Sequence, residues 1–284
     1  PNISSNNTSA AYNRNIFSSN NVNADGFELN DYSDTNTNSQ THVAWNWKAN
    51  GTGSANTDGD INSTVSVNTT AGFSIVKWTG NGSSNQSIGH GLGAVPKMIL
   101  LKQTSGTEHW AVYHAGLTAN KQLYLNLTNA EETSQFGSSA HTSSLFYVGS
   151  NAMVNGSGST YIAYCFAEKT GYSKFGSYTG NGNNDAPFVY LGFKPKFVII
   201  KCSTGTPDWV MYDNKRQGYN TDGNEKLYPN NTNAEADISE IDLLSNGFKL
   251  RNGGTETNTS GGTHIYMAFG QSLVGSNNVP CTAR

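Results

Sequence analysis

Three groups of residues in this sequence carry side chains that could do chemistry. The first is Asp58-Gly59-Asp60-Ile61-Asn62, whose alternating carboxylate and amide oxygens match the opening of a calcium-binding loop. Position six of such a loop is Ser63 here instead of glycine, and position twelve is Thr69 instead of glutamate. Because the sharp turn and the bidentate ligand are both missing, an Asx-type turn is the favoured interpretation.

The second group is formed by histidines. His90 lies in a glycine-rich stretch, and His109 and His114 lie close together, an arrangement that suits a metal or acid–base site. A second copy of the same segment, described below, holds Asp208 and Asp213 at the equivalent positions, which do not form the same ligand set. We therefore predict that these histidines pack in a core and do not form a site.

The third group comprises acids and thiols. Glycoside cleavage needs two carboxylates roughly 5 to 10 Å apart on rigid strands. The acidic clusters at Glu131-Glu132 and at residues 235–242 lie instead in polar segments that we expect to be solvated. The cysteines form no C-x-x-C pair, and they are Cys165, Cys202 and Cys281. We predict a non-enzymatic protein without catalytic residues, cofactor or metal site.

Charge and hydropathy narrow the set of partners. The 284 residues include 17 Lys and Arg against 20 Asp and Glu, a net charge of -3 that argues against nucleic acid and anionic membranes as partners. Apolar runs such as those at residues 98–101 and 197–200 are far shorter than the roughly 20 residues that span a bilayer. We expect no membrane insertion.

The chain repeats itself. Residues 121–131 recur as residues 225–235 with most aligned positions identical, and residues 96–102 recur as 195–201. Trp110-Ala111-Val112-Tyr113 likewise matches Trp209-Val210-Met211-Tyr212. All of these matches have offsets of about 100 residues, so two homologous modules lie in tandem.

The repeat predicts the domain boundaries. We expect full modules at residues 72–168 and 169–270, followed by a C-terminal tail at 271–284. Residues 1–48 match only the second half of a module, which predicts an incomplete module, a polypeptide that extends further upstream and an open sheet edge. Residues 49–71 are an Asn- and Thr-rich connector or added hairpin.

The apolar segments within each module are short, rich in β-branched and aromatic residues, and bounded by Gly, Asn and Pro, a pattern typical of strands. The continuous runs at 98–101 and 197–200 predict strands that are buried on both faces. We predict an all-β fold of tandem β-sandwich modules of about 100 residues, of the immunoglobulin or jelly-roll kind.

Several motifs resemble one repeat family. The chain is similar at these motifs to repeats in virion proteins of tailed bacteriophages, marine phages above all, including tail-fibre-like structural proteins. The matching stretches cover nearly the whole chain and are residues 43–49, 56–59, 70–76, 89–93, 161–168, 171–182 and 267–275.

The resemblance implies a function at the surface of a virus particle. It implies a tail or head fibre, or adhesin module, that contacts host-surface glycans, or alternatively a capsid decoration or tail component that binds no receptor. The implied location is the virion, assembled in the cytoplasm of the host bacterium. The implied partners are other virion proteins and further copies of the chain, with a homotrimer as one arrangement.

Aromatic residues that differ between the modules are the predicted glycan contacts. Ring faces and amides suit the C–H faces and hydroxyls of sugars, and aromatics shared by both modules are expected in the core. Tyr219 and Phe136 lie in segments that differ between the modules. We therefore predict that these two side chains are exposed and bind glycans.

Overall fold

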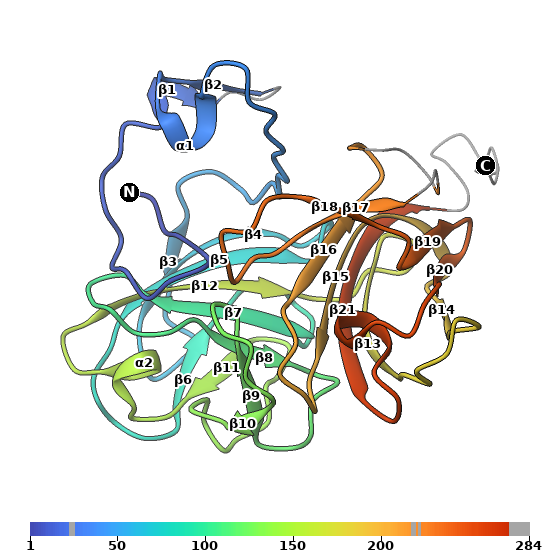
Figure 1. Cartoon of the computed structure of the whole chain (residues 1–284). Coiled ribbons are helices and arrows are strands. Elements are labelled where there is room, and N and C mark those ends of the chain that lie inside the picture. Colours follow the sequence, from blue (N-terminus) through green and yellow to red (C-terminus); the bar gives the residue numbers. More distant parts are fainter. Residues whose placement is uncertain (23–25, 217–219, 221–222, 273–284) are drawn as a thin grey trace.

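Nearly all regular secondary structure in the described part of the chain is antiparallel β-sheet, which confirms the predicted all-β class (Figure 1). The computed structural model describes residues 1–22, 26–216, 220 and 223–272. Helix in this part of the chain is limited to short turns, and none of its helices has the length and hydropathy to cross a membrane. We call residues 1–48 the N-terminal segment, residues 49–168 the first β unit and residues 169–272 the second β unit.

The first β unit contains an eight-stranded sheet with the order β10-β9-β8-β7-β12-β5-β4-β3. A two-stranded sheet of β6 and β11 packs on one of its faces, together with the turn α2 (Ala152–Asn155). The strands are β3 (Ser54–Asn56), β4 (Ser63–Asn68), β5 (Phe73–Thr79), β6 (Gln86–Gly89), β7 (Met98–Gln103), β8 (Ala111–His114), β9 (Lys121–Tyr124), β10 (Glu132–Thr133), β11 (Leu145–Val148) and β12 (Thr160–Phe166).

The second β unit contains a six-stranded sheet with the order β13-β21-β15-β16-β17-β18 and a three-stranded sheet with the order β14-β20-β19. The turn α3 (Thr255–Asn258) precedes its last strand. The strands are β13 (Ser173–Thr179), β14 (Phe188–Tyr190), β15 (Phe193–Cys202), β16 (Val210–Asp213), β17 (Asn224–Leu227), β18 (Ala236–Ile238), β19 (Ile241–Leu244), β20 (Gly247–Leu250) and β21 (Thr263–Ser272).

The two β units share one strand order. From β5 to β10 the first large sheet runs β5-β12-β7-β8-β9-β10, and the second runs β13-β21-β15-β16-β17-β18, with matching strands in matching places. The first unit adds the hairpin of β3 and β4 beside β5, built from the segment at 49–71. The second unit adds β19 to its small sheet.

Both large sheets are apolar on both faces. In β7, Ile99 and Leu101 face the small sheet of their own unit, whereas Met98 and Leu100 face the other unit. The same alternation runs along β15, where residues 197–200 are all buried. The prediction of strands buried on both faces is confirmed, and the outer faces of the two large sheets meet in one central core.

The N-terminal segment joins this central core without completing a sheet. It forms the hairpin of β1 (Phe17–Val22) and β2 (Phe27–Leu29) and the turn α1 (Ser33–Asn36). Residues 41–47 match β12 and β21 in sequence but form no strand. Trp45 and Trp47 from this stretch pack against the central core.

Candidate functional site

Of the two predicted glycan contacts, the structure describes only Phe136. Phe136 is only 7% exposed and packs in the core of the first β unit, with its ring 6.0 Å from that of Tyr113. The predicted exposure of Phe136 is wrong, because an isolated bridge between Phe136 and Val148 draws this residue against the small sheet. Tyr219 lies outside the described residues.

His90 and His114 contact backbone carbonyl groups, whereas His109 contacts a side-chain amide. His90 Nε2 lies 3.2 Å from the carbonyl oxygen of Thr142, and His109 Nδ1 contacts the Asn126 amide. His114 lies between the two β units, where its Nε2 is 3.0 Å from the Tyr266 carbonyl oxygen. Burial lowers the pKa of His114 to about 4, so the ring is neutral at pH 7. In the described part of the chain, no three His, Cys, Asp or Glu side chains converge as metal ligands.

One thiol and one imidazole do meet, in the second β unit. Burial raises the pKa of Cys202, but the neighbouring His264 and Thr204 together more than offset this effect and bring it to about 7. Such a pair resembles a nucleophile with its base. Both side chains are fully buried between the sheets, however, so a substrate has no access to the sulfur.

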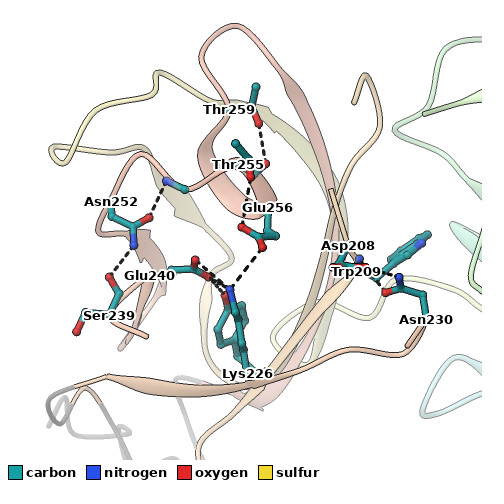
Figure 2. A network of polar contacts seen from close by, with 12 residues as sticks. Asp208, Trp209, Lys226, Asn230, Ser239, Glu240, Asn252, Thr255, Glu256 and Thr259 are labelled. Atoms are coloured by element: carbon teal, nitrogen blue, oxygen red, sulfur yellow. Dashed lines mark hydrogen bonds and ion pairs between the residues drawn. The ribbon is translucent and has the colours of Figure 1, made fainter. Parts of the chain in front are cut away.

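A buried ionic network lies between the sheets of the second β unit (Figure 2). Lys226 on β17 places its Nζ 3.1 Å from both carboxylate oxygens of Glu240 and 3.7 Å from Oε1 of Glu256. The hydroxyl of Tyr212 donates to Glu240 Oε2 at 2.6 Å. Figure 2 shows the Lys226 amine between the two carboxylates, which come from the loop before β19 and from α3.

This network corrects one expectation from the sequence. Glu240 was expected in a solvated acidic segment, yet it is only 4% exposed, because Lys226 and Tyr212 satisfy its carboxylate inside the unit. Burial, followed by the charge of Glu240, raises the pKa of Tyr212 well above its usual value. The Lys226 amine pairs with both acids, so the cluster links β16, β17 and α3 and lacks the open acid pair of a glycosidase.

A cavity of about 990 Å³ lies between the N-terminal segment and the outer face of the first large sheet. Its lining includes Trp110, Tyr164 and Lys77, with Ile3 of the N-terminal segment opposite. The Trp110 indole already donates to the carbonyl oxygen of Ser4 at 2.9 Å. The cavity therefore offers ring surface and hydroxyls, but the Trp110 donor is used within the chain.

The most exposed aromatic pair lies on β14 of the second β unit, at the right of Figure 1. Phe188 is 45% and Tyr190 57% exposed, while Val189 between them is buried. Alternate residues of a strand point to one side, roughly 7 Å apart, so the two rings form one platform. Lys174 supports it: its Nζ donates to the Tyr190 carbonyl at 2.9 Å and lies 5.3 Å from the ring centroid.

Charged groups border this platform. Lys249 pairs with Phe188 across the strands and donates to the almost fully exposed carboxylate of Asp185 at 2.8 Å. The platform is specific to the second unit, since the equivalent positions of β6 are Ser87 and Gly89. Sequence reasoning missed it because β6 and β14 share no identical residues, although a search for unit-specific aromatics at alternating spacing would have found it.

Comparison with known proteins identifies a family. The family described as "Domain of unknown function (DUF7483)" matches residues 1–272. No curated protein and no solved structure matches the chain.

Proposed function

We propose that this chain, which belongs to the DUF7483 family, is a non-enzymatic surface component of a bacteriophage virion that contacts host-surface glycans. The motif resemblance to tail-fibre-like repeats supports the virion and its proteins as the setting. The observation that carries the binding proposal is the exposed platform of Phe188 and Tyr190 on β14, bordered by Lys174 and Asp185.

The chemistry of this platform suits sugars. Two ring faces on one side of a strand offer apolar surface to the C–H face of a pyranose. The neighbouring amines and carboxylate can bond to its hydroxyls, and the almost fully exposed Asp185 carboxylate is accessible. Each such contact is weak, so several copies on one particle would provide the avidity.

The test is a glycan array with the purified chain, followed by titration of the best ligand. We expect Phe188→Ala together with Tyr190→Ala to weaken binding about tenfold or more. Val95→Ala is the matched control, because Val95 is a similarly exposed apolar residue, 43% accessible, in the first β unit. Equal binding by the double variant and the control would overturn the assignment of the platform.

The alternative is a capsid decoration or tail component without a receptor. The central core favours this alternative, since it joins the N-terminal segment and both β units into one body, as a purely structural component requires. Absence of binding to any glycan by the intact chain, together with no inhibition of phage adsorption, would leave this alternative in place of the adhesin.

A further inference from the structure

Three equivalent aromatic rings meet at the centre of the molecule. Trp47, Phe166 and Phe269 occupy the same position in the three copies of the terminal strand motif. Their ring centroids form a nearly equilateral triangle, with sides of 6.2 Å, 5.6 Å and 5.9 Å. The N-terminal segment and the two β units are therefore arranged around an approximate threefold axis.

One hydrogen bond recurs between neighbours around this axis. Trp209 Nε1 of the second unit donates to the carbonyl oxygen of Tyr124 in the first unit at 2.9 Å. Trp110 Nε1 of the first unit donates to the carbonyl oxygen of Ser4 in the N-terminal segment, also at 2.9 Å. Each tryptophan thus binds the same backbone position of the preceding copy.

A second hydrogen bond recurs seven residues farther along. The Glu131 amide donates to the carbonyl oxygen of Ser203 at 2.7 Å, and the Ala11 amide donates to the equivalent Thr104 at 2.9 Å. Residues 4–11 therefore bind the first unit as residues 124–131 bind the second. The contact is a repeated interface of this architecture.

The third copy of this binding segment has no such neighbour in the described part of the chain. Residues 228–235 have nearly the sequence of 124–131, and Asn230 accepts from the Trp209 amide as Asn126 accepts from the Trp110 amide. Residues 232–235 are nevertheless exposed, whereas 128–131 are half-buried. No hydrogen bond from another described residue reaches the Tyr228 carbonyl or the Glu235 amide.

The N-terminal segment holds the place of the missing neighbour. His114, at the end of β8, contacts the Tyr266 carbonyl of the second unit. Its equivalent Asp213, at the end of β16, accepts a hydrogen bond from Trp45 Nε1 at 3.2 Å. The second unit therefore contacts the N-terminal segment as the first unit contacts the second.

The N-terminal segment lacks the paired central strand that each β unit has. β12 pairs with β5 and β7, and β21 pairs with β13 and β15, one on each side. Residues 41–47, at the same position, form no strand, and His42, Ala44 and Asn46 are exposed where all their equivalents are buried. A segment with a strand-like sequence and no ladder partner can accept strands on both edges.

We propose that this open corner, formed by residues 41–47 and 228–235, is the docking site for the strand half of a further repeat. The occupant is a polypeptide of the type of residues 72–120, joined to Pro1 in the register in which those residues precede Lys121. Its strands pair with both edges of 41–47, its tryptophan donates to the Tyr228 carbonyl, and its backbone accepts from the Glu235 amide.

The test is to supply the proposed occupant as part of the same polypeptide. A copy of residues 72–120 is fused to Pro1 of the full chain, and amide hydrogen exchange is followed at residues 42–47 and 232–235. We expect exchange there to slow by about 100-fold or more, because paired strands open far less often than unpaired segments. The same fusion carrying Ala44→Pro should lose this protection, since proline interrupts a central ladder, whereas Ala44→Ser should keep it.

A second measurement tests the open corner without any fusion. In the unextended chain Ala44→Pro should leave the urea midpoint unchanged, because residue 44 has no ladder to lose. Ala163→Pro, at the paired and buried equivalent in β12, should lower it strongly. Equal destabilisation by the two prolines would overturn the proposal. In the fusion, amides at residues 42–47 and 232–235 that stay unprotected would also overturn it, and so would protection that survives Ala44→Pro.

Discussion

The two β units fill the same position between their sheets in chemically different ways. In the first unit the position is largely apolar: the rings of Tyr113 and Phe136 lie 6.0 Å apart, and the Gln122 amide contacts the Met153 sulfur at 3.9 Å. Beside this cluster lies a cavity of about 440 Å³, lined in part by Tyr113 and Phe136.

In the second unit the equivalent residues are Tyr212, Glu240, Lys226 and Glu256, which form the buried ionic network. The repeat alignment pairs each of them with one residue of the first unit, so one backbone accommodates both solutions. Loss of one apolar side chain leaves a cavity, whereas loss of one partner of a buried ion pair leaves an uncompensated charge. The two units share one strand order, so this order does not fix the chemistry of the layer between the sheets.

The largest expected loss of stability comes from removing one charge of the buried ionic network. Glu240→Gln keeps the size of the side chain but leaves the Lys226 amine without its closest carboxylate, so we expect a loss of about 3 kcal/mol or more in urea denaturation. Asp185→Asn, which breaks an exposed ion pair with Lys249, serves as the control and should cause no measurable change.

A second variant replaces the three charged residues of the network by the equivalent residues of the first unit. The triple variant Lys226→Gln, Glu240→Phe, Glu256→Met should be about as stable as the original chain, because no charge remains buried. A triple variant as unstable as Glu240→Gln would show that the ionic residues do more than compensate one another.

The next effect concerns pH at the contact between the units. His114 has a pKa of about 4 in the folded chain against 6.5 normally, so the unfolded chain binds the proton more tightly. The stability that this neutral histidine contributes is complete above pH 6.5 and is lost as the pH falls toward 4, by about 3 kcal/mol. As the pH is lowered, the urea midpoint of His114→Gln should fall less steeply than that of the original chain. Identical slopes would contradict this origin of acid sensitivity.

The smallest effect compares the two tryptophan donors. Trp110→Phe and Trp209→Phe each keep a ring but remove one indole hydrogen bond, to Ser4 and Tyr124 respectively. We expect a cost of about 1 kcal/mol for each bond. Hydrogen exchange should show the loss at residues 2–11 for Trp110→Phe and at residues 124–131 for Trp209→Phe. Loosening in the same segment for both variants would argue against equivalent contacts.

Some functional residues were within reach of the sequence. The logic that selected Phe136 also fits Phe188 and Tyr190, which are aromatic only in the second unit. Sequence alone does not distinguish them, because burial of Phe136 follows from one bridge to Val148, whereas exposure of Tyr190 follows from the position of β14 at a sheet edge. The sequence does not reveal the Lys226–Glu240 pair either, because 14 residues separate the two side chains and only the fold brings them together.

The sequence by itself determined the strands, their all-β class, the repeat and the runs buried on both faces, because these depend on local patterns of apolar residues. Tertiary structure alone decided that the outer faces of the two large sheets share one core and that Trp47 meets Phe166 and Phe269 around an axis. It also decided that residues 41–47, despite a strand-like sequence, form no strand. A β-strand needs hydrogen-bonded neighbours, and whether neighbours are present is a property of the assembled fold.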